Sequence, residues 1–191
     1  MLEVHRNQDI AMIERCKKGD SQAQRYIYER YAPRMFAVSC RYLSNDMEAE
    51  DALVTAFTKV FKNISQFRFD GSFEGWIRRI VVNEALSTIR KNKATALLQT
   101  EYLPEDQDLT FPDTQIEADE LLELIAVLPT GYRTVFNLYA IEGYAHQEIA
   151  LQLGINESTS KSQLSRARKM LRDLLEKRDS QLKKIIGEDE K

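Results

Sequence analysis

Small polar and basic side chains follow one another between residues 157 and 172, and this composition suits a surface that binds nucleic acid. Lys161 can donate to guanine acceptors, and Glu157 can accept from the amine of cytosine. Basic side chains further along suit phosphate oxygens, which position a protein on a duplex without reporting its base sequence. The candidate base contacts are Glu157, Ser158, Lys161, Ser162 and Ser165, and the candidate phosphate contacts are Arg166, Arg168, Lys169 and Arg172.

A second group of residues combines aromatic rings with polar side chains. The segment 67–73 is rich in aromatic residues and contains Gly71, and rings of this kind stack on exposed bases with about 1–3 kcal/mol per base. On the helix expected to follow, Arg79, Asn83 and Arg90 fall within about 40° of one another. The candidates for this surface are Phe67, Arg68, Phe69, Ser72, Arg79, Asn83 and Arg90. Core packing is the alternative for the aromatic residues; it is favoured for Trp76 and stays open for Phe67 and Phe69.

Helices must position both groups, because helical periodicity dominates the chain and strand alternation is missing. We expect an all-α fold. The predicted helices are 8–18, 20–43, 46–62, 72–92, 115–128, 130–142, 145–153 and 157–178.

Residues 144–156 have the layout of a helix-turn-helix. Gly154 can adopt the positive φ of the turn, and Asn156 is a natural N-cap for the second helix. Ala150 is small where the two helices would approach most closely. That second helix would carry the candidate base contacts at its N-terminal end, which is the end that enters the major groove. An ordinary surface helix of an α-hairpin is the alternative interpretation.

The net charge of −3 conceals a segmental pattern. Residues 59–93 contain eight basic and three acidic residues, residues 157–184 contain nine basic and four acidic residues, and residues 94–132 contain nine acidic residues with no Lys or Arg. We expect two small helical domains joined by an acidic linker, with boundaries at 1–93, 94–116 for the linker, 117–180, and 181–191 for a C-terminal tail. A solvated charged face is the simpler explanation of any single charged run.

Several classes of function lack support in the sequence. No glycine pattern forms a dinucleotide or P-loop phosphate site, and no nucleophile motif or metal-ligand spacing is present, so we expect no catalytic residue, metal or cofactor. Cys16 and Cys40 fit neither a disulfide framework nor a metal site. The longest apolar run is far short of a membrane span, and the N-terminus has no signal-peptide pattern, so a cytoplasmic location is expected.

The C-terminal half resembles region 4 of a bacterial sigma factor of the sigma-70 family, in its extracytoplasmic-function (ECF) group. The motifs that carry this resemblance lie at 128–136, 142–144, 148–150, 153–155 and 161–168. It implies binding of the −35 promoter element by the helix-turn-helix and docking on the flap of the polymerase β subunit. The chain departs from the family pattern at Ala145, where Ser or Thr is usual, at Ser160, where an aliphatic residue is usual, and at Gln163, where Arg is common.

The N-terminal half is similar to sigma region 2 along 28–36, 46–53, 56–61 and 67–85. This similarity implies that the loop 67–73 captures a flipped −10 base, with Asn83 near that element. It also implies that Glu48, Glu50, Asp51 and Phe57 take part in binding core RNA polymerase, the acids contacting the β′ clamp. Val54 and Thr55 stand where Gln and an acid are typical of the family.

The resemblance therefore implies a transcription initiation factor, not an enzyme, that binds core RNA polymerase and promoter DNA. An anti-sigma factor is a further partner that the family makes plausible. The alternative from another class is a stand-alone helix-turn-helix repressor or activator that binds duplex DNA without polymerase. Such a regulator would need no aromatic loop beside Asn83, so the N-terminal half distinguishes the two hypotheses.

Overall fold

The computed structural model describes residues 2–95 and 118–188, and within these ranges it is helical without a strand. The expected all-α fold is confirmed. The chain divides into two compact units, Met1–Leu97 and Leu98–Lys191. The predicted acidic linker, residues 94–116, lies almost entirely outside the described residues.

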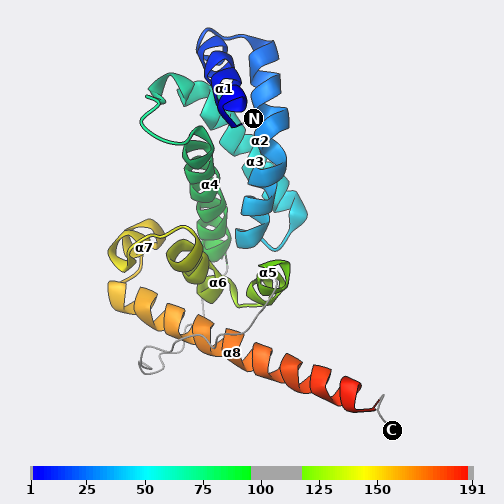
Figure 1. The fold of residues 1–191 in the computed structure, drawn as a ribbon. Coiled ribbons are helices and arrows are strands. Elements are labelled where there is room, and N and C mark those ends of the chain that lie inside the picture. The colour runs from blue at the N-terminus through cyan, green and yellow to red at the C-terminus, as the bar shows by residue number, and fades with distance from the viewer. Residues whose placement is uncertain (1, 96–117, 189–191) are drawn as a thin grey trace. The chain divides into compact units, whose positions relative to one another are not determined.

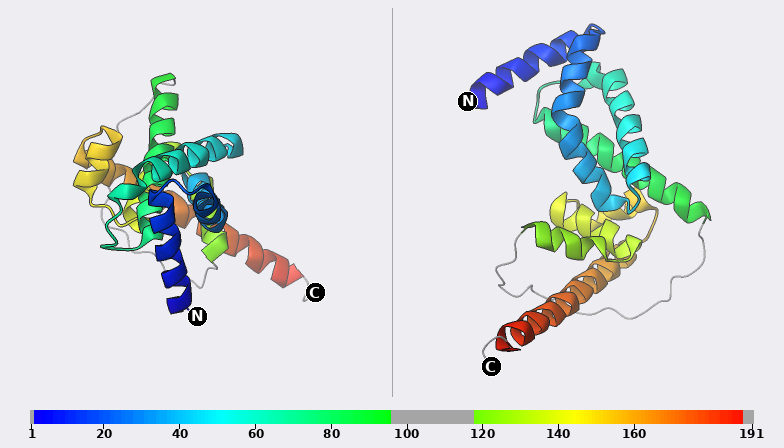
Figure 2. Two further views of the ribbon diagram at one scale, coloured as in Figure 1. Left: turned by 90° about the horizontal axis from the view of Figure 1, so that it is seen from above. Right: turned by 90° about the vertical axis from the view of Figure 1, so that its right-hand side faces the viewer.

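Over residues 2–95, the N-terminal unit forms four α-helices and a short 3-10 turn (Figure 1). In chain order these are α1 (Leu2–Lys17), α2 (Ser21–Tyr42), α3 (Asp46–Asn63), η1 (Ile64–Gln66) and α4 (Phe73–Thr95). Asp20 caps α2 by accepting from the backbone N–H groups of Gln22 and Ala23, and Asn45 caps α3 in the same way through Met47. Helix α1 begins at Leu2, earlier than the predicted start at residue 8, and leaves α2 at an angle (Figure 2).

Helices α2, α3 and α4 pack against one another around an apolar core. On α3 the buried residues recur at helical spacing, so one stripe of the helix faces its neighbours. This stripe consists of Ala49, Ala52, Leu53, Ala56, Phe57 and Val60. Glu84 of α4 is 7% exposed and pairs with Lys59 of α3, so the buried carboxylate keeps an opposite charge.

The C-terminal unit arranges shorter helices along one long helix (Figure 1). Its elements are α5 (Ala118–Ala126), α6 (Thr130–Phe136), the π-helical turn η2 (Asn137–Ile141), α7 (His146–Leu153) and α8 (Glu157–Glu188). Helices α5, α6 and α7 each contact α8. Buried Arg133 of α6 donates to the carbonyl of Ala126 at 2.7 Å, which joins α6 to the end of α5.

Two predicted boundaries in this unit are wrong. The continuous helix expected over 130–142 changes into a π-helical turn after Phe136, and such turns widen the backbone and shift the side chains that follow. Helix α8 continues to Glu188, through most of the segment expected as a C-terminal tail.

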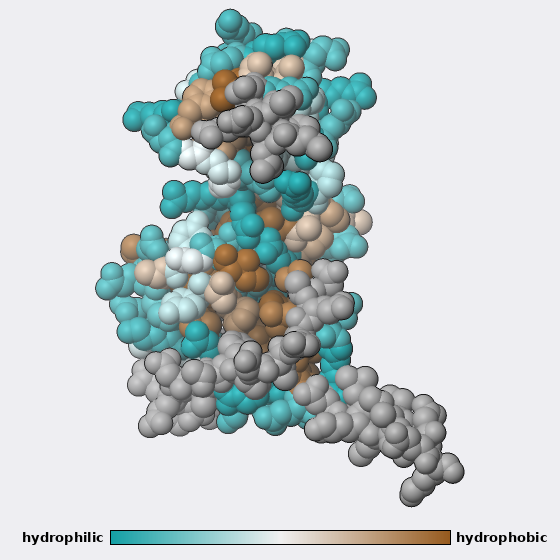
Figure 3. Space-filling view, in the orientation of Figure 1, coloured by the Kyte–Doolittle hydropathy of each residue, from teal (hydrophilic) through white to brown (hydrophobic). Residues whose placement is uncertain are grey.

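The surface carries no feature of a bilayer-spanning segment in the described ranges, where no helix is both long and apolar enough to cross a membrane. On the face drawn in Figure 3, hydrophobic residues form patches among hydrophilic ones. Within the same ranges no cluster of three or more His, Cys, Asp or Glu side chains could hold a metal ion. Both cysteines are free thiols, Cys16 buried and Cys40 partly buried.

Candidate nucleic-acid interfaces

The aromatic segment before α4 separates into buried and exposed rings. Phe67 is 6% exposed, and its ring centroid lies 5.0 Å from those of Phe69 and Phe73 and 5.6 Å from that of Trp76. Phe69 is 39% exposed, and the ammonium group of Lys17 lies 4.5 Å from its ring centroid. Phe67 is therefore a packing residue, whereas Phe69 presents a ring at the surface.

The backbone at Phe69 explains this separation. Phe69 has a φ of 62°, and it is the one non-glycine residue with positive φ among the described residues. The left-handed conformation costs a residue with a side chain about 1–2 kcal/mol. It turns the chain so that Phe67 and Phe69, two positions apart, differ sharply in exposure.

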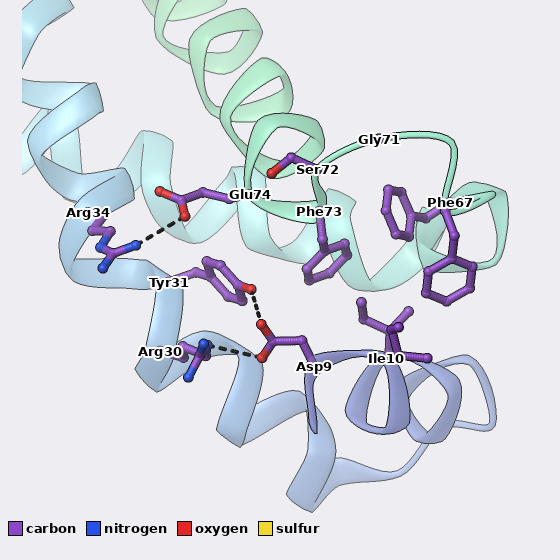
Figure 4. A pocket seen from close by; sticks show the side chains of 12 residues that line it. Asp9, Ile10, Arg30, Tyr31, Arg34, Phe67, Gly71, Ser72, Phe73 and Glu74 are labelled. Carbon is purple, nitrogen blue, oxygen red and sulfur yellow. Dashed lines mark hydrogen bonds and ion pairs between the residues drawn. The ribbon is translucent and has the colours of Figure 1, made fainter. Parts of the chain in front are cut away.

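A cavity of about 770 Å³ lies between α1, α2 and the start of α4 (Figure 4). This volume is within the range of about 300–1,000 Å³ that is typical of small-molecule sites. Aromatic and aliphatic side chains form much of its wall, and charged groups from α1, α2 and α4 also line it. The lining residues are Asp9, Ile10, Ile13, Arg30, Tyr31, Arg34, Phe67, Phe69, Gly71, Ser72, Phe73 and Glu74.

Asp9 of α1 organises the charged part of this cavity (Figure 4). Its carboxylate accepts from the Tyr31 hydroxyl at 2.9 Å and pairs with the Arg30 guanidinium at 3.0 Å. Burial and the adjacent Asp9 raise the pKa of Tyr31 to about 12, so this phenol stays protonated at neutral pH. Arg34 pairs across the cavity with Glu74 at 3.1 Å. Apolar walls with a few fixed polar groups are typical of ligand sites.

The predicted polar face of α4 is present. Arg79, Asn83 and Arg90 are exposed, and they lie opposite the buried Ile77 and Val81. Arg68 is exposed in the preceding segment. Ser72 has a different role, because its hydroxyl accepts from the backbone N–H of Gly75 at 3.3 Å and so supports the start of α4.

Helices α7 and α8 form the predicted helix-turn-helix. Gly154 between them has a φ of 64°, and the N–H of Ile155 donates to the carbonyl of Ala150 at 3.1 Å. Ala145 cannot cap α7 with its side chain, but Glu148 accepts from the backbone N–H of Ala145 at 2.8 Å. Half of a capping box thus remains where the family pattern has Ser or Thr.

The N-terminal part of α8 exposes several of the predicted base contacts. Ser158 and Lys161 are exposed, and Lys161 pairs with Glu157 at 2.8 Å, which lowers the pKa of Glu157. Ser162 donates to the carbonyl of Thr159 at 3.0 Å. Of the remaining predicted contacts on α8, Lys169 is exposed, and the others are partly buried, namely Ser165, Arg166, Arg168 and Arg172.

The two departures within α8 both face inward. Ser160 is fully buried beside His146 of α7, and Gln163 is 8% exposed. A side-chain carbon added at Gly131 of α6 would lie 3.6 Å from the Gln163 amide, so Gln163 packs against α6. Neither residue belongs to the exposed face that carries Lys161.

Comparison with known proteins assigns both halves of the chain. Residues 27–95 match the family description Sigma-70 region 2, and residues 118–171 match Sigma-70, region 4. The ECF RNA polymerase sigma factor SigW of Bacillus subtilis (strain 168) is 32% identical over 176 residues, which cover 85% of this chain and 94% of that protein. The chain belongs to the ECF group of the sigma-70 family.

Other relatives of this sigma factor differ in length. The ECF RNA polymerase sigma factor SigE of Mycolicibacterium smegmatis is 31% identical over 165 residues, covering 81% of this chain but 62% of that protein. Among solved structures, the sigma factor RpoE in complex with the anti-sigma factor NepR from Bartonella quintana aligns with 80% of this chain and 96% of that chain, at 20% identity and a TM-score of 0.48.

The predicted polymerase contacts of the sigma factor do not form one surface. Glu50 and Asp51 are exposed on α3, whereas Glu48 accepts from the Asn92 amide of α4 at 3.0 Å. Phe57 is 2% exposed, and its ring lies edge-on to that of Tyr28 with centroids 4.9 Å apart. Phe57 therefore packs in the core and does not reach the surface.

A groove of about 430 Å³ between α2 and α3 lies next to Glu50. Val54, one of the departures from the family pattern, is 56% exposed and lines the groove. Its other lining residues are Tyr28, Glu29, Ala32, Pro33, Phe36, Glu50 and Leu53. The departure at Val54 thus adds apolar surface beside an acidic side chain.

Sequence patterns miss the contribution of α1 to the sigma factor's cavity. Asp9 and Tyr31 are 22 positions apart, and no local spacing links them. His146 and Tyr139 are missed for the same reason, because their rings meet only after the π-helical turn and α7 have formed.

Proposed function

We propose that this sigma factor binds core RNA polymerase, directs it to promoters through the −10 and −35 elements, and nucleates DNA melting. The observation that carries the proposal is the aromatic-lined cavity at the N-terminal end of α4, a helix whose exposed face bears Arg79 and Asn83. This arrangement suits a base that has left its duplex. A helix-turn-helix in the same chain suits the paired −35 element.

At the −10 element, one non-template base would leave the stack and enter the cavity. Phe69 offers an exposed ring at the cavity wall, and a stacked base gains about 1–3 kcal/mol. The exposed cations Arg79 and Arg90 would hold the adjoining phosphates, and Asn83 can donate to and accept from base edges. Melting follows because the flipped base is stabilised in the open state.

At the −35 element, the first turns of α8 would enter the major groove. Lys161 and Ser158 are exposed there and suit base edges. Arg166, Arg168, Lys169 and Arg172 lie further along, where phosphates are the expected partners. Because phosphate contacts dominate such binding, the affinity for free DNA should be weak and sensitive to salt.

For the polymerase contact, the exposed acids Glu50 and Asp51 and the adjoining groove suit a partner with basic and apolar side chains, as expected of the β′ clamp. The second unit would dock on the β flap. The boundaries of the first domain at 1–93 and of the acidic linker at 94–116 are also part of the proposal. The anti-sigma partner also remains a prediction, best examined by affinity purification from cells of the source organism.

The alternative, a stand-alone helix-turn-helix regulator, needs only the second unit. It leaves the cavity of about 770 Å³ and the polar face of α4 without a role.

Transcription from a promoter library tests the proposal. The purified chain is mixed with core polymerase, and transcript starts are mapped with and without it. We expect a stable complex and a shared pair of elements upstream of the starts. Arg79→Ala should reduce these transcripts, whereas Lys62→Ala, which removes an exposed cation from α3, should not. The absence of both complex and starts would reject the proposal, and duplex binding alone would favour the alternative.

A further inference from the structure

The two helices of the helix-turn-helix are joined at their N-terminal ends by a polar contact. Ser160, in the first turn of α8, is fully buried, and its hydroxyl oxygen lies 2.9 Å from Nδ1 of His146, the first residue of α7. A buried hydroxyl is costly unless it has a hydrogen-bond partner. The contact therefore favours one arrangement of α7 and α8 over neighbouring ones. Ser160 also stands where the family usually has an aliphatic residue, which could make no such bond.

The same histidine contacts a ring from the π-helical turn. The imidazole of His146 stacks on Tyr139, with ring centroids 4.6 Å apart and planes inclined by 21°. The guanidinium carbon of Arg168, on α8, lies 5.7 Å from the Tyr139 centroid, a cation–π distance. His146 thus connects η2, α7 and α8.

We propose that His146 is a positioning residue for −35 recognition, holding the first turn of α8 through Ser160 and the Arg168 guanidinium through Tyr139. The inference rests on the proposed function. Successive residues on a helix are separated by about 100°. Because Ser160 points inward to His146, the adjacent Lys161 is held outward, so a rotation of the first turn would move Lys161 relative to the groove.

The charges around His146 are consistent with a neutral imidazole. Burial lowers its pKa, Lys161 and Arg168 lower it further, and Glu157 opposes them. A neutral ring can accept from or donate to the Ser160 hydroxyl according to its tautomer. It also avoids placing a third cation beside Lys161 and Arg168.

Two substitutions of equal shape at residue 160 provide the central test. Ser160→Val removes the hydroxyl and Ser160→Thr keeps it, while both add the same bulk. His146→Phe keeps a ring for Tyr139 but removes the bond. Each full-length variant is assembled with core polymerase, and transcription is measured on promoters with a randomised −35 element. Thermal unfolding of the free chain is measured in parallel.

We expect Ser160→Val and His146→Phe each to reduce the preference for the best −35 sequence by about three- to tenfold, the range for one hydrogen bond. The double variant should lose no more of the −35 preference than either single variant. Ser160→Thr, unlike Ser160→Val, should retain the wild-type −35 preference. Loss of stability with an unchanged −35 preference would overturn the inference. Absence of any −35 dependence in the wild type would instead overturn the proposed function.

Discussion

The two units of this sigma factor have candidate nucleic-acid sites of opposite shape. In the N-terminal unit the candidate site is hollow: Phe67 and Phe73 line a cavity, and Asp9 holds polar groups at its wall. In the C-terminal unit the candidate site is convex, because Ser158 and Lys161 project from α8 while apolar residues lie on its other side. A cavity suits a base that has left the stack, and a convex helix suits bases that remain paired in a groove.

Charge does not distinguish the two basic segments that carry the candidate sites, since residues 59–93 and 157–184 each have a net charge of +5. The difference lies in where aromatic residues are held. Under the proposed function, similar basic segments would therefore bind different states of DNA according to the packing beneath them. The following predictions test this contrast, beginning with the largest expected effect.

Phe67→Ala should lower the free energy of unfolding by about 3–5 kcal/mol, because it removes a buried ring that contacts Phe69, Phe73 and Trp76. Chemical denaturation of the full chain measures this. Phe36→Ala, on the partly exposed side of α2, is the matched control and should cost clearly less. Equal losses would mean that the aromatic cluster does not support the cavity.

Phe69→Ala should reduce open-complex formation by about five- to one-hundredfold, the range for losing one stacked base. Binding to core polymerase should not change, since the ring is exposed and distant in sequence from Glu50. Asn83→Ala should act in the same direction. Single-strand-specific footprinting gives the first quantity and competition for core polymerase gives the second. Parallel losses in both would remove these residues from the −10 site.

Lys161→Ala should change the −35 base preference by about tenfold at one position, as expected for a lost base contact. Lys169→Ala should weaken binding about equally for all sequences, because phosphate contacts carry no sequence information. Transcription from the randomised −35 library distinguishes the two. If Lys161→Ala keeps the wild-type preference, Lys161 does not contact bases.

Glu157→Gln should raise the affinity for any duplex by a few-fold, because it releases Lys161 from its ion pair and removes a negative charge facing phosphate. The salt dependence of binding should steepen by about one unit in the slope of log K against log salt. Glu176→Gln, exposed further along α8, is the control for charge alone. Equal effects of the two substitutions would indicate a general charge effect.

The smallest expected effect is a pH dependence of stability from His146. Its pKa in the folded chain lies below the ordinary value of about 6.5, so the unfolded chain takes up the proton first as pH falls. Stability should be constant above that value and should decline as pH falls from it toward the folded pKa. Urea unfolding between about pH 8 and pH 5.5 measures this. His146→Phe should reduce this decline of stability with falling pH. An unchanged slope of stability against pH would contradict the assignment.

Much of the local structure of this molecule can be predicted from short-range sequence patterns. The capping residues Asp20 and Asn45 and the turn at Gly154 act over a few positions, and helical rotation alone groups Arg79, Asn83 and Arg90. These features are therefore predictable from the sequence. The family resemblance adds the expectation that the N-terminal half binds the −10 element and the C-terminal half the −35 element.

Contacts between distant segments could not be predicted in this way. The Asp9 carboxylate meets Tyr31 only when α1 packs on α2, and Ser160 gains a partner only when α7 places His146 beside it. Phe67 and Phe69 are the same residue type and lie two positions apart, so the sequence does not show which ring is buried. The left-handed backbone at Phe69 separates them. The family resemblance implies that Phe57 takes part in polymerase binding, but its position on α3 points it into the core.

Under the proposed function, selection for folding and selection for transcription favour different residues at position 69, where the backbone is left-handed. Glycine and asparagine tolerate this conformation better than phenylalanine does. A library randomised at residue 69 and sorted for folding alone would accept them readily, whereas sorting for promoter opening would retain a ring. Variants at residue 69 that are selected for thermostability alone should therefore fold normally but open promoters less well.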